Sequence, residues 1–296
     1  AYPPLLKECE DAPAGLYFRS GDQSRPPQGN GIPIAVIGTR NMSLYGREWT
    51  RRLIKAFASA AGEKAVIVSG LAYGIDVTAH RAALDCGLET VAVMATGPDS
   101  VYPPRHAGIA AEIASSGALV TDFPPGAEPK KVNFLRRNRI IAGMSRAVVL
   151  IESRVRGGGM MTSGLAFSYG RDVYALPGRA DDQCSLGCNW LIRSKKAEAV
   201  FSEADLVESL GLGKLPRGDP EKSAGNVMER YADRDGKTVE RLAGILSAVR
   251  KKRGISLDEL ASGLGIPWQE ARRYVSMLEC DGLIQVDLLQ RCSISI

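Results

Sequence analysis

Short apolar runs recur along the N-terminal part of the chain. The run at 32–38, Ile-Pro-Ile-Ala-Val-Ile-Gly, is almost continuously apolar and ends in glycine. A strand buried on both faces has this pattern, because neither side of it meets water. Similar runs, several of them separated by helix-like stretches, occur at 65–69, 90–95, 118–121, 147–151 and 172–176. The alternation predicts an α/β fold with a doubly wound, mostly parallel sheet and helices on both faces.

The ends of these predicted strands carry the residues best suited to binding. Gly38-Thr39-Arg40 follows the first strand, Ser69-Gly70 closes the second, and Gly157-Gly158-Gly159 follows the fifth. Ligands of such sheets bind outside the carboxyl ends of the strands, and glycine lets another backbone come close. Ser43 is expected to cap a helix that begins near Leu44, at a helix end that favours an anion. We therefore expect an anion-binding cleft at this edge.

The chain is predicted to have three parts. The alternating pattern fades after Gly211, and the following residues are rich in Gly, Pro, Asp and Lys. Residues 1–211 are interpreted as an extended Rossmann-like core with an N-terminal extension, and 212–237 as a linker. Residues 238–296 are interpreted as a small winged-helix domain.

The winged-helix interpretation rests on helix signals followed by alternation. Ser256 can cap a short helix with Glu259 three residues on, a third helix is expected from Pro267 or Trp268, and 283–296 alternates as a β-wing would. The region of the third helix has two basic residues, Arg272 and Arg273, and three acidic ones, Glu270, Glu279 and Asp281. A role in protein interaction or structure is therefore favoured over duplex DNA binding.

Positive charge is concentrated in one segment. The net charge is only +5, which permits an anionic partner without requiring one. From Lys130 to Arg156 there are eight Lys or Arg residues against one acid, Glu152. The run 130–143 combines five cations with an amide and an aromatic ring, Phe134, and such a set suits phosphates and an unpaired base. The alternative for a charge run is a solvated helix face.

Other functional classes lack their signals. The loop after the first strand has neither the G-x-G-x-x-G nor the Walker pattern, and no G-x-S-x-G elbow surrounds Ser69. Six cysteines without a secretory signal indicate reduced thiols in the cytoplasm, and their spacing does not predict a metal site. No cofactor and no membrane span are expected. The chain begins at Ala1 without methionine, so we expect that the natural sequence extends further.

Taken together, the motifs resemble the DNA processing protein A family, also called DprA or Smf. The resemblance extends from about Tyr2 to Gly211. It rests on G-T-R with Ser43 and Tyr45-Gly46, then S-G-L-A-Y-G-I-D-V-T-A-H, Y-P-P-R-H, F-L-R-R-N-R-I-I-A-G, and V-Y-A-L-P-G followed by S-L-G-C-N-W-L-I. The loop at 158–163 departs from the family's usual S-G-[ST]-x-x-T-A pattern, which changes the placement of its hydroxyl groups.

The resemblance implies a non-enzymatic, cytoplasmic protein that binds single-stranded DNA, assists loading of the RecA recombinase in natural transformation and recombination, and forms a homodimer. By motif position, the DNA-binding residues would be Arg40, Ser69, Gly70, Lys131, Phe134, Arg137, Asn138, Arg139, Gly158 and Gly159. Arg136, an added basic residue, is also included in this set; for Arg136 and for Lys130 the alternative is a solvated side chain.

Two other functions remain open. A Rossmann-like nucleotide-processing enzyme of the phosphoribohydrolase type would need an acid near its glycine loop, and the residues after Gly159 up to Gly170 contain no carboxylate. A transcription regulator would rest on the winged helix alone, whose third helix is acidic.

Overall fold

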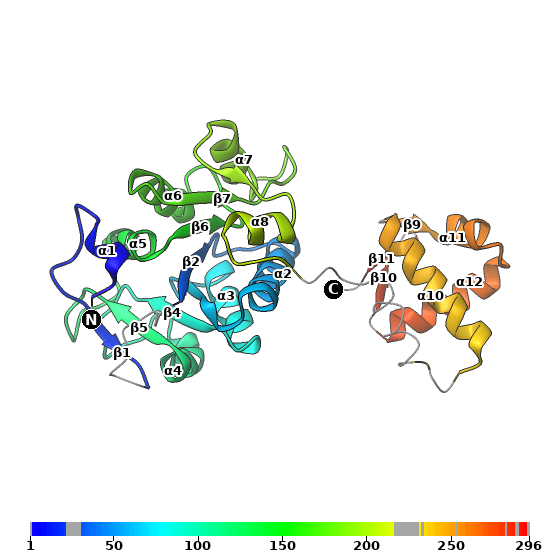
Figure 1. Ribbon diagram of the computed structural model, residues 1–296, viewed down its shortest axis with the longest axis horizontal. Helices are drawn as coiled ribbons and strands as arrows, with labels where there is room; N and C mark the ends of the chain where they lie inside the picture. The colour runs from blue at the N-terminus through cyan, green and yellow to red at the C-terminus, as the bar shows by residue number, and fades with distance from the viewer. Residues whose placement is uncertain are drawn as a thin grey trace. The chain divides into compact units, whose positions relative to one another are not determined.

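The structure is a computed structural model that describes residues 2–21, 31–215, 231, 234–252, 254–281, 283–287 and 290–294. It contains two compact units, Ala1–Pro216 and Arg217–Ile296, each drawn in Figure 1. The division falls within the predicted linker 212–237, most of which lies outside the described residues.

The first unit is built on a sheet of eight described strands in the order β1-β5-β4-β3-β2-β6-β7-β8. All neighbouring pairs are parallel except β1 with β5. The strands are β1 (Tyr17–Arg19), β2 (Ile32–Ile37), β3 (Ala65–Ser69), β4 (Glu89–Val93), β5 (Ala118–Thr121), β6 (Ala147–Leu150), β7 (Asp172–Ala175) and β8 (Glu198–Ala199). The predicted doubly wound, mostly parallel sheet is confirmed, and the edge strands β1 and β8 were not predicted.

Helices cover both faces of the sheet (Figure 1). One face is covered by α2, α3 and α8, the other by α1, α5, α6 and α7, and α4 packs over β4 and β5. Their bounds are α1 (Pro4–Lys7), α2 (Leu44–Ala61), α3 (Ile75–Asp85), α4 (Ala107–Ser116), α5 (Lys131–Met144), α6 (Gly158–Ser168), α7 (Leu186–Arg193) and α8 (Glu203–Ser209), with short 3-10 turns at Gly62–Lys64 and Pro104–His106.

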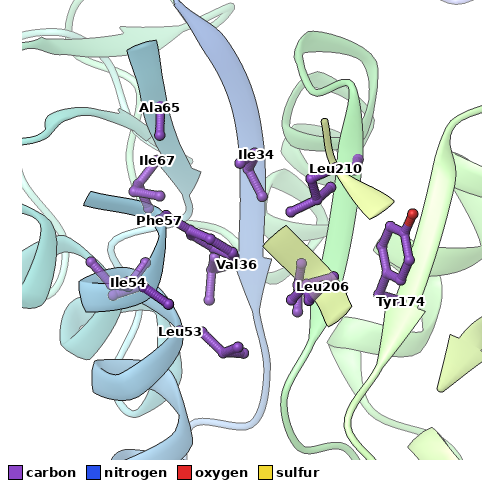
Figure 2. Close-up of a cluster of buried hydrophobic side chains, with 14 of the residues drawn as sticks. Ile34, Val36, Leu53, Ile54, Phe57, Ala65, Ile67, Tyr174, Leu206 and Leu210 are labelled. Atoms are coloured by element: carbon purple, nitrogen blue, oxygen red, sulfur yellow. The ribbon is translucent and has the colours of Figure 1, made fainter. Parts of the chain in front are cut away.

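The central strand β2 shows why its sequence is almost wholly apolar. Its side chains alternate between the two layers: Ile34 and Val36 belong to the core under α2 and α8, whereas Ala35 and Ile37 belong to the core under α5. Figure 2 shows Phe57 of α2 beside Val36, and the α8 residue Leu206 belongs to the same core cluster. A strand that packs on both faces has no position for a polar side chain.

The strand order creates one point where the chain changes direction across the sheet. From β2 the chain adds β3, β4 and β5 on one side, and then returns through α5 to place β6 on the other side of β2. The loops that leave β2 and β6 therefore diverge, and a crevice opens at the carboxyl ends of these two strands.

The second unit has the predicted winged-helix arrangement. It consists of α10 (Gly236–Lys251), β9 (Ile255–Ser256), α11 (Leu257–Leu264), α12 (Trp268–Cys280), β10 (Ile284–Val286) and β11 (Arg291–Ile294), with the strands in the order β10-β11-β9. Ser256 and Glu259 form a capping box at α11, as expected. Ala271, Tyr274 and Leu278 of α12 are buried in the core of this unit.

No helix in the described ranges is long and apolar enough to cross a bilayer. No group of three or more His, Cys, Asp or Glu side chains in those ranges could hold a metal ion.

Helix α3 carries a buried imidazole. His80 of α3 is fully buried, and its Nδ1 lies 2.7 Å from Oγ1 of Thr90. The Thr90 hydroxyl donates to the carbonyl of Ile67 at 2.9 Å, so Nδ1 carries the proton and donates to Thr90. Nε2 has no hydrogen-bond partner among the described residues. Burial, and then the nearby charges of Arg137 and His106, lower the pKa of His80 to about 3.

This imidazole should make the fold sensitive to acid. A pKa of about 3 in the folded state lies below the unfolded value of about 6.5, so the unfolded chain binds the proton first. The contribution of His80 to stability is complete above pH ~6.5 and declines toward pH ~3 by at most about 1.4 kcal/mol per pH unit. Urea unfolding at a series of pH values measures this slope. His80→Asn, whose Nδ2 can still donate to Thr90, should show a shallower slope, and an unchanged slope would contradict the assignment.

Candidate nucleic-acid interface

A hollow of about 600 Å³ occupies the crevice at the carboxyl ends of β2 and β6. Its walls come from the loop after β2, the loop after β6 and one face of α5. The residues that line it are Ile37, Gly38, Thr39, Arg40, Ala72, Asp76, Tyr102, Pro129, Lys131, Phe134, Leu135, Arg137, Asn138, Ile141, Ser153, Arg154, Arg156, Gly157, Gly158, Gly159 and Thr162. The predicted position of a binding cleft therefore coincides with a hollow.

Close backbone packing fixes the loop after β2. The Thr39 amide donates to the carbonyl of Glu152 at 2.8 Å, and the Ile75 amide donates to the carbonyl of Thr39 at 3.2 Å. Gly74 has a φ of +77°, and a Cβ there would lie 2.3 Å from the Thr39 carbonyl oxygen. Only glycine meets both conditions. The loop is thereby held against α3, and exposed Arg40 lies at the rim of the hollow.

A buried carboxylate occupies the start of α2. Ser43 caps this helix as predicted, accepting from the Gly46 amide at 3.1 Å. Its hydroxyl and its amide both donate to the carboxylate of Glu152, which is fully buried. The anion expected at this helix end is thus supplied by the protein itself, and the contact ties the loop after β6 to the loop after β2.

Helix α5 presents an aromatic ring to the hollow. Phe134 is half-buried, with the guanidinium of Arg40 5.1 Å from its ring centroid and the ring of Tyr102 edge-on at 5.6 Å. Lys131 and Asn138, three residues before and four residues after Phe134, line the same wall because these spacings share one helix face. A ring beside two cations can receive a base between phosphate contacts.

The loop after β6 adds two cations and a helix end. Gly158 and Gly159 begin α6, where the first backbone amides have no partner within the helix and favour an anion. Arg154 and Arg156 are exposed and line the hollow, and neither was predicted as a site residue. Their position directly after a predicted strand, within the basic segment, was the signal that could have identified them.

The hollow is electropositive. Arg40, Lys131, Arg154 and Arg156 are exposed around it, and none of them forms an ion pair with a described residue. Unpaired cations around a concave surface attract phosphates.

Arg137 has a different position from the one expected. Its side chain is 3% exposed and donates through Nη1 to the carbonyls of Gly70, at 2.7 Å, and Val93. It lies beside the buried Asp76, whose pKa is raised by burial and held down by the Arg137 charge. Burial lowers the pKa of Arg137 to about 10. Nη1 is engaged by these two carbonyls, whereas the buried Nε has no hydrogen-bond partner among the described residues. Because the side chain is almost wholly buried, Arg137 supports the floor of the hollow and is poorly placed to bind phosphate.

Four other predicted residues lie outside the lining of the hollow. Ser69 is fully buried and donates to the carbonyl of Val36 at 2.7 Å, and Gly70 leaves room for Arg137, whose Nη2 would lie 2.5 Å from a Cβ. Arg136 and Arg139 lie on another side of α5. Arg139 pairs with Asp122 at 2.6 Å.

The structure therefore brings part of the predicted set together. The hollow collects Arg40, Lys131, Phe134, Asn138, Gly158 and Gly159, with Arg137 at its floor. Tyr102, which belongs to the Y-P-P-R-H motif and was not predicted as a site residue, adds an exposed ring.

Comparison with known families identifies the larger unit. Residues 1–211 match the family model for DNA recombination-mediator protein A. The chain belongs to this family. Residues 243–285 match a winged helix-turn-helix DNA-binding model, in agreement with the fold of the second unit.

Curated members of the DNA recombination-mediator protein A family include close relatives. The chain is 38% identical to protein Smf of Synechocystis over 222 residues, which is 75% of this chain and 55% of that protein. It is 38% identical to DNA processing protein DprA of Streptococcus pneumoniae over 70% of each sequence. The chain thus spans little more than half the length of the Synechocystis relative.

Solved family structures share the fold. The X-ray structure of S. pneumoniae DprA aligns with a TM-score of 0.65 at 37% identity, over 70% of each chain. A Helicobacter pylori DNA processing protein A structure aligns with a TM-score of 0.64 at 28% identity, over 71% of this chain and 93% of that one. The H. pylori study concerns single-stranded DNA binding by that protein.

Proposed function

We propose that the hollow at the carboxyl ends of β2 and β6 binds single-stranded DNA without chemical turnover. The observation that carries this proposal is the half-buried ring of Phe134, flanked by exposed Arg40 and Lys131. In this proposal the cations contact successive phosphates while a base stacks on the ring. Family membership and the H. pylori structure support it.

The geometry favours single strands over duplex. A base can reach a half-buried ring only if it leaves its neighbours, and bases of a duplex are already stacked and paired. The hollow presents no helix that could enter a DNA groove. Its contacts would therefore be to the DNA backbone and to the face of a base. Base sequence would then matter little at Phe134.

Membership of the family also supports a proposal for the full protein. We propose that the full protein acts in the cytoplasm, loads the RecA recombinase onto single-stranded DNA during natural transformation and recombination, and works as a homodimer. The S. pneumoniae homologue, which is named a DNA processing protein, supports the general role.

The competing proposal is a nucleotide-processing enzyme. One observation favours it, because the carboxyl group of Asp76 lines the hollow and burial raises its pKa. That carboxyl group is nevertheless 7% exposed and lies beside Arg137, which suits a structural pair better than a general base. Incubation with a panel of nucleotides tests this alternative: turnover that Asp76→Asn abolishes would support the enzyme.

Salt dependence tests the phosphate contacts. For single strands, each phosphate contact contributes about 0.7 to the slope of log affinity against log salt concentration. Arg40→Gln and Lys131→Gln should each lower the slope by about that amount in fluorescence anisotropy titrations with labelled oligothymidine. Arg51→Gln removes one exposed charge from α2, outside the lining of the hollow, and should leave the slope unchanged. Equal slopes in all four proteins would contradict the assignment.

A further inference from the structure

A second hollow of about 460 Å³ lies on another side of α5. It is formed between α5, the segment that leads into β1, and the residue that follows β5. Its lining residues are Pro13, Ala14, Gly15, Leu16, Tyr17, Asp122, Arg136 and Arg139, none of which lines the first hollow.

Asp122, which lines this second hollow, carries an unpartnered acceptor. Its side chain is 6% exposed, and Oδ2 accepts from Nη2 of Arg139 at 2.6 Å. Oδ1 is buried and has no hydrogen-bond partner in the described part of the chain. Arg139 also donates to the backbone carbonyl of Asp11, so two of its donors are engaged. A buried carboxylate oxygen without a donor is costly, and a ligand that brings an N–H group would satisfy it.

Two other lining groups complement this acceptor. Arg136 is exposed, its guanidinium lies 5.8 Å from the ring centroid of Phe123, and it forms no ion pair with a described residue. The ring of Tyr17 is 45% exposed. One nucleotide offers a matching group to each of these side chains. Its phosphate can pair with Arg136, its base can stack on Tyr17, and an amine on the base can donate to Asp122.

Helix α5 connects the two hollows. Lys131 and Leu135 line the first, and Arg136 and Arg139 line the second. At 100° per residue these two pairs lie on adjacent sides of α5, and exposed Val132 lies on the same side as Arg136 and Arg139. A strand that leaves Phe134 and crosses the exposed side of α5 would reach Arg136.

We propose that the second hollow is an additional nucleotide subsite for the same DNA strand, and that it favours bases with an exocyclic amine. The inference rests on the proposed binding of single-stranded DNA. Cytosine, adenine and guanine carry an amine that can donate to Asp122 Oδ1. Thymine has only its ring N–H, which lies between two carbonyl oxygens that the carboxylate would repel.

The test compares oligodeoxycytidine with oligothymidine, each of about 15 nucleotides, by anisotropy. The wild-type chain should bind the cytidine strand roughly twofold to tenfold more tightly, the value of one hydrogen bond. Asp122→Asn should bring this ratio close to one. The substitution also releases Arg139, which raises affinity for both strands alike, so the ratio and not the affinity is the measurement.

Two further variants test the ring and the cation. Tyr17→Ala and Arg136→Gln should weaken binding of the long strands by at least threefold, whereas Tyr17→Phe and the one-charge control Arg51→Gln should bind as the wild type does. Strands of about four nucleotides, which fill only the first hollow, should not distinguish Tyr17→Ala from wild type.

The subsite would be overturned if Asp122→Asn preferred oligodeoxycytidine over oligothymidine as strongly as the wild type does. It would also be overturned if Tyr17→Ala and Arg136→Gln bound the long strands with full affinity. Either result would leave DNA binding at the first hollow intact. Absence of any binding of single strands by the wild-type chain would instead refute the proposed function, and the subsite with it.

Discussion

Replacement of Arg137 by methionine is expected to lower the free energy of unfolding by about 3–5 kcal/mol, the cost of leaving a buried charge without its partner. Arg137 is 3% exposed, and its loss would leave Asp76, which is 7% exposed, without the neighbouring cation. The carbonyl of Gly70 would also lose its donor. Urea unfolding followed by circular dichroism measures the difference.

Two variants separate this explanation from a general loss of packing. Arg136→Met removes the adjacent, exposed guanidinium and should change stability by less than about 1 kcal/mol. The double variant Asp76→Asn with Arg137→Met should recover part of the loss, because no buried charge then lacks a partner. An Arg137→Met protein as stable as the wild type, but defective in DNA binding, would return Arg137 to the phosphate-binding set.

Replacement of Phe134 by alanine is expected to weaken binding of single strands by about 1–3 kcal/mol, or roughly 5-fold to 150-fold. The ring supplies the proposed stacking face, and it also holds the Arg40 guanidinium, 5.1 Å from its centroid. Anisotropy with labelled oligothymidine measures the change.

A tryptophan at this position keeps an aromatic face and should retain most of the affinity. Phe167→Ala removes a 51% exposed ring of α6 that does not line the hollow, and serves as the matched control. If Phe134→Ala kept full affinity while Lys131→Gln lost affinity, the protein would bind only the DNA backbone, and no base would stack on the ring.

The sheet was predictable because its central strands are buried on both faces. Each of the six predicted runs coincides with a strand of the sheet, and the predicted and observed ends differ by at most two residues. The edge strands gave no such signal: β1 has three residues, of which the outer two are exposed, and β8 has only two. A short strand with one covered side has no continuous apolar run.

The site was predictable in its location but not in the orientation of α5. Arg136 and Arg139, three residues apart, share one side of α5, whereas Arg137 points away from both, because successive residues differ by 100° around a helix. Arg137 lies on the same stripe as Ile140 and Ile141, three and four residues later, and all three are buried. The spacing indicated burial, but Arg137 was predicted to bind DNA because its side chain is charged.

The contact between Glu152 and Ser43 was not predictable, since it joins residues separated by 109 positions. Glu152 appeared only as the single acid in a basic segment. Its burial depends on how β6 is placed beside β2, which no local pattern specifies.

The most direct measurement is a crystal structure of this chain with an oligothymidine. The account predicts a thymine ring stacked on Phe134, with phosphates in contact with Arg40 and Lys131 at the carboxyl ends of β2 and β6. A strand bound elsewhere, for example along α12 of the winged helix, with the hollow free of DNA, would contradict it.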